Sequence, residues 1–87
     1  MLLRINLNKK NKKMTAIPLS ELAVGEQRKL SGITDPQLEG KLMAMGMLPG
    51  VRIELVRTAL SGNTLYIKFN GYCLALRRSE ARMILLN

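Results

Sequence analysis

Two adjacent runs of β-forming residues, joined by Asn70-Gly71, constrain this chain more than any other feature. The runs cover residues 64–69 and 72–77, and both are rich in aliphatic and aromatic side chains. Asn-Gly accepts positive φ at both central positions of a type I′ turn at little cost, which makes it the strongest short-range signal for a β-hairpin. The chain is therefore predicted to be mainly β.

Further strands and short helical turns are expected around this hairpin. Residues 51–58 alternate apolar and polar side chains, residues 27–33 alternate more weakly, and residues 83–86 form a closing apolar run. Alternation with a period of two is typical of half-buried strands. Short helical turns are expected within 17–25 and 79–82. The sum is about five antiparallel strands, enough for a small barrel that removes the edges of its sheet.

One α-helix is expected at about 36–45. It would start with a proline, Thr34 or Asp35 can cap it, and Gly46 provides a left-handed stop. Gly40 lies inside this helix, where glycine costs about 1 kcal/mol relative to alanine. Its presence suggests close packing of the backbone at that point.

The strand at 72–77 has apolar side chains on both faces, so it is expected to be central or to cross a barrel interior. On this basis Cys73 is expected to be a small buried side chain, because no histidine is present to activate it as a nucleophile. It is the only cysteine, which excludes a disulfide within the chain and fits a reducing cytoplasm.

The net charge of +8 is distributed unevenly. Residues 1–13 hold five of the 14 basic residues and no acid, which leaves nine basic against six acidic residues in 14–87. We expect 1–13 to be a flexible basic leader and 14–87 to be the folded domain, with an ordinary solvated surface. No stretch approaches the roughly 20 apolar residues of a spanning helix, so membrane insertion is not expected and a cytoplasmic location is.

The side chains that catalysis and metal binding need are missing or scattered. Histidine, the commonest general base and metal ligand, is absent, the six carboxylates occur singly, and the glycines form no nucleotide-binding loop. No enzymatic activity, resident metal or cofactor is expected. The methionines at 43, 45 and 47 could hold soft Cu(I), but core filling or an adaptable contact surface is the preferred interpretation.

Three arginines cluster at the last helical turn, namely Arg77, Arg78 and Arg82. Arg57 is expected nearby. They form either a solvated rim or a patch for phosphate or an acidic partner. Small barrels that bind nucleic acid usually add aromatic stacking platforms, and Phe69, one of three aromatic residues, is expected to point inward. Stable nucleic-acid binding is therefore not expected.

Two blocks, residues 42–51 and 71–81, resemble the FeoA family of small ferrous iron transport proteins. The first is similar to the family's helix ending in Met-Gly, a hydrophobic residue and Pro-Gly, and the second to its strand ending in Ala-Leu-Arg and followed by Glu-Ala. Many members carry Ala-Pro and then Gly-Asp-Pro between these blocks. This chain instead has Ala59-Leu60 and Gly62-Asn63-Thr64.

The resemblance implies an SH3-like barrel that is not an enzyme and works beside FeoB, the membrane ferrous iron transporter with a cytoplasmic GTP-binding domain. We expect an apolar corner and the strand after it to dock on that domain, with arginines as a charged rim. The candidate partner-binding residues are Met47, Leu48, Pro49, Arg52, Arg57, Arg77, Arg78 and Arg82.

Several alternatives stay open at this stage. Met47 and Leu48 could simply fasten the helix to the barrel. The leader and the arginine rim could make the chain a small nucleic-acid-binding module. Direct chaperoning of ferrous iron is disfavoured by the absence of histidine and of paired carboxylates. A chain of 87 residues buries only roughly 60% of its unfolded surface, so self-association could also add stability.

Overall fold

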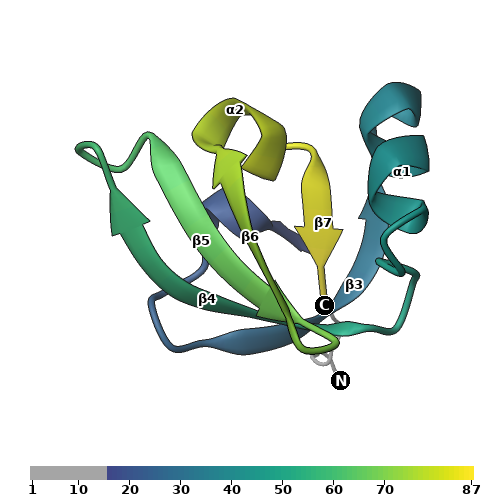
Figure 1. The fold of residues 1–87 in the computed structure, drawn as a ribbon, viewed down its shortest axis with the longest axis horizontal. Helices are drawn as coiled ribbons and strands as arrows, with labels where there is room; N and C mark the ends of the chain where they lie inside the picture. The colour runs from purple at the N-terminus through teal and green to yellow at the C-terminus, as the bar shows by residue number, and fades with distance from the viewer. Residues whose placement is uncertain (1–15) are drawn as a thin grey trace, which may run out of the picture.

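The computed structural model describes residues 16–87, in which six antiparallel strands form one curved sheet in the order β2-β7-β3-β4-β5-β6 (Figure 1). The elements are β2 (Ile17–Pro18), the 3-10 helix η1 (Leu19–Glu21), β3 (Gln27–Ile33), α1 (Pro36–Met43), β4 (Arg52–Ala59), β5 (Thr64–Phe69), β6 (Tyr72–Arg77), α2 (Arg78–Ala81) and β7 (Ile84–Leu86). The mainly β prediction is confirmed. One strand more than expected forms because Ile17-Pro18 pairs with β7. The leader predicted at 1–13 lies outside the described residues.

The hairpin predicted from Asn70-Gly71 is present. Asn70 and Gly71 have φ of 50° and 80°, as a type I′ turn requires. The two strands pair without a break from Phe69 opposite Tyr72 to Thr64 opposite Arg77. The alternation of β5 turns its apolar side chains inward, and they are at most 2% exposed.

One hydrophobic core joins the sheet to both helices. Its fully buried larger side chains come from η1, α1, the loop after α1, β4, β5 and β7: Leu19, Leu42, Met47, Ile53, Leu55, Leu65, Ile67, Phe69, Ile84 and Leu86. The helix α1 contributes Leu42 together with Leu38, one turn apart on a single face. It covers one end of the sheet (Figure 1).

The helix α1 begins as predicted and ends two residues early. The side chain of Asp35 caps it by accepting a hydrogen bond from the Leu38 amide at 2.9 Å. After Met43 the chain tightens, because the Met45 amide donates to the Leu42 carbonyl three residues back, and Gly46 at φ 92° completes the stop.

The expectation of close packing at Gly40 is wrong. A Cβ placed at Gly40 would meet no atom within 4 Å outside its own helix.

The predictions for β6 also need correction. Among the described residues β6 pairs only with β5 and stands at the end of the sheet, so it is an edge strand and not a central one. Its second face looks outward, which leaves Cys73 and Ala75 exposed. Leu76 on the inner face is 4% exposed. The apolar character of the outer face therefore does not reflect burial.

Candidate interaction surface

The connection from α1 to β4 is a tightly hydrogen-bonded loop. The Met47 amide donates to the Leu42 carbonyl at 3.0 Å, and the Val51 amide donates to the Leu48 carbonyl at 3.0 Å. The Gly50 amide reaches across to the Leu30 carbonyl of β3 at 2.8 Å. Because these bonds fix the backbone, the side chains on the loop are held in defined positions before any partner arrives.

The loop separates the three residues of the predicted docking corner. Met47 is 0% exposed and belongs to the core, so it fastens the end of α1 to the barrel and cannot contact a partner. Leu48 is 45% exposed, and Pro49 is also exposed. The expectation that all three dock is wrong for Met47. We call Leu48 and Pro49 the apolar corner.

The tip of the β5–β6 hairpin is hydrogen-bonded to the backbone just before the apolar corner. The Asn70 side-chain amide donates to the Gly46 carbonyl at 3.3 Å. Beside this contact lies an open groove of about 270 Å³, which we call the hairpin-end groove. It is lined by Gln27, Arg52, Glu54, Lys68, Phe69, Asn70 and Gly71.

Of the predicted arginines, only Arg52 belongs to this groove. Lys68 was not predicted as a site residue, although the alternation of β5 already placed it on the outer face. Its position opposite Glu54 depends on the register of β4 and β5, which shifts at a bulge between Leu55 and Arg57.

The remaining arginines lie elsewhere, so the structure does not gather the corner and the rim into one site. Arg57 lies over the Tyr66 ring, with its guanidinium carbon 4.0 Å from the ring centroid, a cation–π contact. Arg77 stands six residues beyond Gly71 on β6, which at about 3.3 Å per residue is about 20 Å from the hairpin tip.

Arg78 has a structural role. Its guanidinium donates to the Gly62 carbonyl in the β4–β5 loop and, through Nη1, to the Ser20 carbonyl of η1 at 2.7 Å. Its amide donates to the Asn63 carbonyl at 2.9 Å. These bonds occupy the guanidinium, so Arg78 is not a free member of a charged rim.

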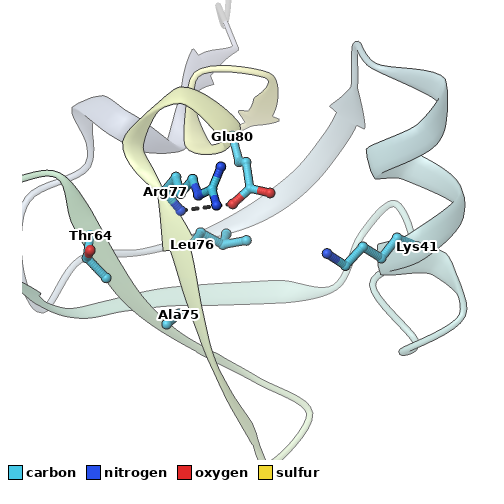
Figure 2. A pocket seen from close by; sticks show the side chains of 6 residues that line it. All are labelled: Lys41, Thr64, Ala75, Leu76, Arg77 and Glu80. Atoms are coloured by element: carbon cyan, nitrogen blue, oxygen red, sulfur yellow. Dashed lines mark hydrogen bonds between the residues drawn. The ribbon is translucent and has the colours of Figure 1, made fainter.

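Arg77 and Arg82 remain exposed near α2, where they line an open cavity of about 360 Å³ together with Asn63, Thr64, Arg78 and Ser79. The Arg77 amide donates to the Glu80 carboxylate at 2.9 Å. On the side of α2 that faces Lys41 lies a second, larger cavity (Figure 2).

The aromatic residues do not form a platform for bases. Phe69 is 2% exposed, as expected, and the face of Tyr66 is covered by Arg57. Tyr72 is 57% exposed but stands alone among the described residues as a well-exposed ring. Base stacking by several rings, the usual device of small barrels that bind single strands, has no counterpart in this part of the chain.

One carboxylate has a perturbed acidity for structural reasons. The pKa of Glu26 is lowered from the ordinary value, first by the hydrogen bond that its side chain accepts from the Ala23 amide and then by Arg28. The Arg28 guanidinium lies 2.7 Å from the carboxylate. The Glu26 carboxylate thereby holds together the turn that precedes β3.

No metal-binding cluster occurs within residues 16–87: no three histidine, cysteine, aspartate or glutamate side chains gather there. The methionines at 43 and 47 have opposite surroundings, since Met43 is 47% exposed and Met47 is buried.

Within residues 16–87, no helix has both the length and the apolar character needed to cross a membrane.

Comparison with known proteins agrees with this fold. A FeoA-like protein from Clostridium acetobutylicum is 32% identical, with a TM-score of 0.77 over 86% of this chain and 88% of that one. Iron(II) transport protein A from Clostridium thermocellum is 30% identical, with a TM-score of 0.74 over 82% of this chain and 44% of that one.

A more distant structure, FeoA from Stenotrophomonas maltophilia, is described as an SH3 domain protein. It is 23% identical, with a TM-score of 0.73 over 83% of this chain and 91% of that one, and it supports the SH3-like fold. A search of curated proteins gave no match. The sequence model of the FeoA domain matches residues 17–87, so this chain belongs to the FeoA family.

Proposed function

We propose that this protein is a non-enzymatic cytoplasmic accessory protein of ferrous iron transport, and that it acts by binding the GTP-binding domain of an FeoB-type transporter. Membership of the FeoA family links the chain to ferrous iron transport. The partner follows from the family resemblance in the sequence blocks at 42–51 and 71–81.

The observation that carries the proposal is the exposed leucine on a fixed loop. Leu48 is 45% exposed although turns are normally polar, and the backbone around it is hydrogen-bonded to α1 and β3. A rigid apolar anchor loses little conformational freedom on binding, so more of its burial energy is available for affinity. Arg52 and Lys68 in the adjoining groove supply charge that would steer association.

The variant Leu48→Glu tests this surface. We expect it to weaken binding to the isolated GTP-binding domain at least about tenfold, or about 1.4 kcal/mol, because a charge replaces the apolar side chain that the complex would bury. Calorimetry with and without guanine nucleotide measures the affinity. The fold is expected to survive, since Leu48 lies outside the core cluster, and circular dichroism with thermal melting checks this.

The matched control is Leu60→Glu. Leu60 is 73% exposed and follows the other end of β4, so it receives the same change away from the apolar corner. It should bind as the wild type does. An equal loss in both variants would show that the apolar corner is not the contact. The absence of any binding between the wild type and the domain would refute the proposed partner.

A further inference from the structure

Apart from the charge of Arg77 at its end, β6 has few of the devices by which proteins normally protect a sheet edge. Such edges usually carry lysine, proline or a bulge, which prevent another strand from pairing. Residues 72–77 contain no lysine and no proline, and their register with β5 is continuous over six pairs. At the other end of the sheet, β2 is two residues long and contains Pro18.

The register of the hairpin identifies which backbone groups are free. Phe69 and Tyr72 close a two-residue type I′ turn, so they form a hydrogen-bonded pair, and the pairs at Leu74 and Leu76 follow the same pattern. Cys73, Ala75 and Arg77 therefore direct their amides and carbonyls away from β5. The Arg77 amide confirms this pattern, because it donates to the Glu80 carboxylate. Within residues 16–87 no group pairs with the amides and carbonyls of Cys73 and Ala75, so they can bond to an added strand.

A groove of about 530 Å³ runs beside this edge, which we call the β6-edge groove. Figure 2 shows Ala75, Leu76 and Arg77 on β6, with the Lys41 side chain pointing toward them from α1. Thr64 and Glu80 complete the lining. A strand laid along β6 would meet apolar Leu76 on one face and the small Ala75 on the other, so its side chains would not be blocked.

The charges around the edge favour an acidic occupant. Lys41 and Arg77 line the groove, and Lys68 lies opposite Cys73 on the neighbouring strand. The single carboxylate of the lining, Glu80, already accepts from the Arg77 amide. In the adjoining cavity the Asp35 carboxylate accepts from the Leu38 amide. The lining of this groove therefore carries two cations against one carboxylate, and that carboxylate is already held by a backbone amide.

The same charges disfavour two other occupants. Antiparallel pairing of two β6 strands centred on Ala75 would place Arg77 of each copy opposite Cys73, two strands from Lys68 of the other, which adds like charges to the same face of the joined sheet. Residues 1–13 carry five basic residues and no acid, so they have the same sign as the edge.

We propose that the free edge of β6 binds an extended acidic segment of a partner protein, which pairs with Cys73 and Ala75 as an additional strand. Main-chain hydrogen bonds supply affinity, and Lys41 and Arg77 select carboxylate side chains. This surface is separate from the apolar corner and goes beyond the proposed function. Since its groove shares no residue with the apolar corner, Leu48→Glu should leave binding at the β6 edge unchanged.

The test uses the full chain and a short acetylated peptide that alternates valine and glutamate. Titration at up to millimolar peptide should shift the backbone amide resonances of Cys73 and Ala75 and slow their exchange with solvent. A peptide that alternates valine and lysine should bind at least about tenfold more weakly because it meets Lys41 and Arg77. Methylating the peptide nitrogens that pair with the edge should abolish binding to the unchanged protein.

A pair of variants tests the backbone donor directly. Ala75→Pro removes an amide that points away from β5, a place where edge strands tolerate proline. It should keep the fold and lose at least about nine-tenths of the affinity, while Ala75→Thr, which keeps the amide, should retain it. The proposal would be overturned if both charged peptides bound equally well. It would also be overturned if the peptide shifted the amide resonance of Leu48 and not those of β6, or if it shifted no resonance at all. Concentration-dependent protection of these amides without peptide would show that a second copy occupies the edge.

Discussion

At the scale of single residues, Gly40 is the position where a substitution should improve the protein. It lies exposed inside α1, and a Cβ there meets nothing within 4 Å outside the helix. We expect Gly40→Ala to raise the free energy of unfolding by about 0.5–1 kcal/mol, since alanine loses less backbone freedom on folding. Urea denaturation followed by circular dichroism measures the change.

Gly46 provides the contrast for that experiment. Its φ of 92° belongs to the left-handed region, so Gly46→Ala should destabilise the protein by about 1–2 kcal/mol. A loss of stability in Gly40→Ala of the same size would mean that α1 packs more closely at this point than its contacts indicate.

Met47 and Leu48 show which residue properties the sequence could and could not predict. Both are apolar and both follow the left-handed stop at Gly46, so local pattern alone left docking and core packing open for each. Burial is decided by how the chain turns between α1 and β4, a turn fixed by hydrogen bonds to Leu42 and Leu30. The Leu30 contact comes from β3, about twenty positions earlier. The pattern of apolar residues around Met47 and Leu48 therefore cannot reveal it.

At the scale of elements, β6 shows the same limit in a strand. Its two apolar faces are typical of a central strand that is covered on both faces, and the sequence therefore predicted burial of Cys73. The hairpin itself needed only the Asn70-Gly71 signal and was predicted correctly. Whether a further strand pairs with β6 depends on where β2 and β7 go: β2 lies far away in the sequence, and β7 follows α2 but pairs with β2 and β3 instead.

Arg78 connects three elements, and its replacement should loosen them together. Its guanidinium bonds to Gly62 in the β4–β5 loop and to Ser20 in η1. Arg78→Lys keeps the charge but loses the planar fork that reaches both carbonyls, so we expect a loss of about 1–3 kcal/mol. For a domain of this size, the melting temperature should fall by about 4–8 °C for each kcal/mol.

The exposed neighbour offers the control for this variant. Arg77→Lys makes the same change at an exposed side chain for which the described residues show no guanidinium hydrogen bond. Its free energy of unfolding should stay within about 0.5 kcal/mol of the wild type. If Arg77→Lys melted as low as Arg78→Lys, the links to Gly62 and Ser20 would not be what holds this end of the barrel.

At the scale of the whole molecule, the fold class and the family could be predicted because they depend on features that are local in sequence. The hairpin, the capped helix and the alternating strand at 51–58 each carry their own signal. The interaction surface depends on what the curvature of the sheet brings together. It joins the tip of the β5–β6 hairpin to the loop after α1 through Asn70 and Gly46, 24 residues apart. It leaves Arg77 and Arg82 at the opposite end of β6.

The distribution of charge along the whole chain allows a test that separates a protein partner from a nucleic acid. Residues 1–13 hold five of the 14 basic residues, and the rest carries nine against six acidic ones. Removing 1–13 should abolish weak binding to a single-stranded oligonucleotide and lower the slope of log K against log salt by up to about 3.5, at about 0.7 per neutralised phosphate. Fluorescence anisotropy at several salt concentrations measures both.

Binding to the transporter domain should be unchanged by this deletion, because the apolar corner and the hairpin-end groove lie within 16–87. Tight oligonucleotide binding that survives the deletion and resists salt would instead support a nucleic-acid-binding barrel.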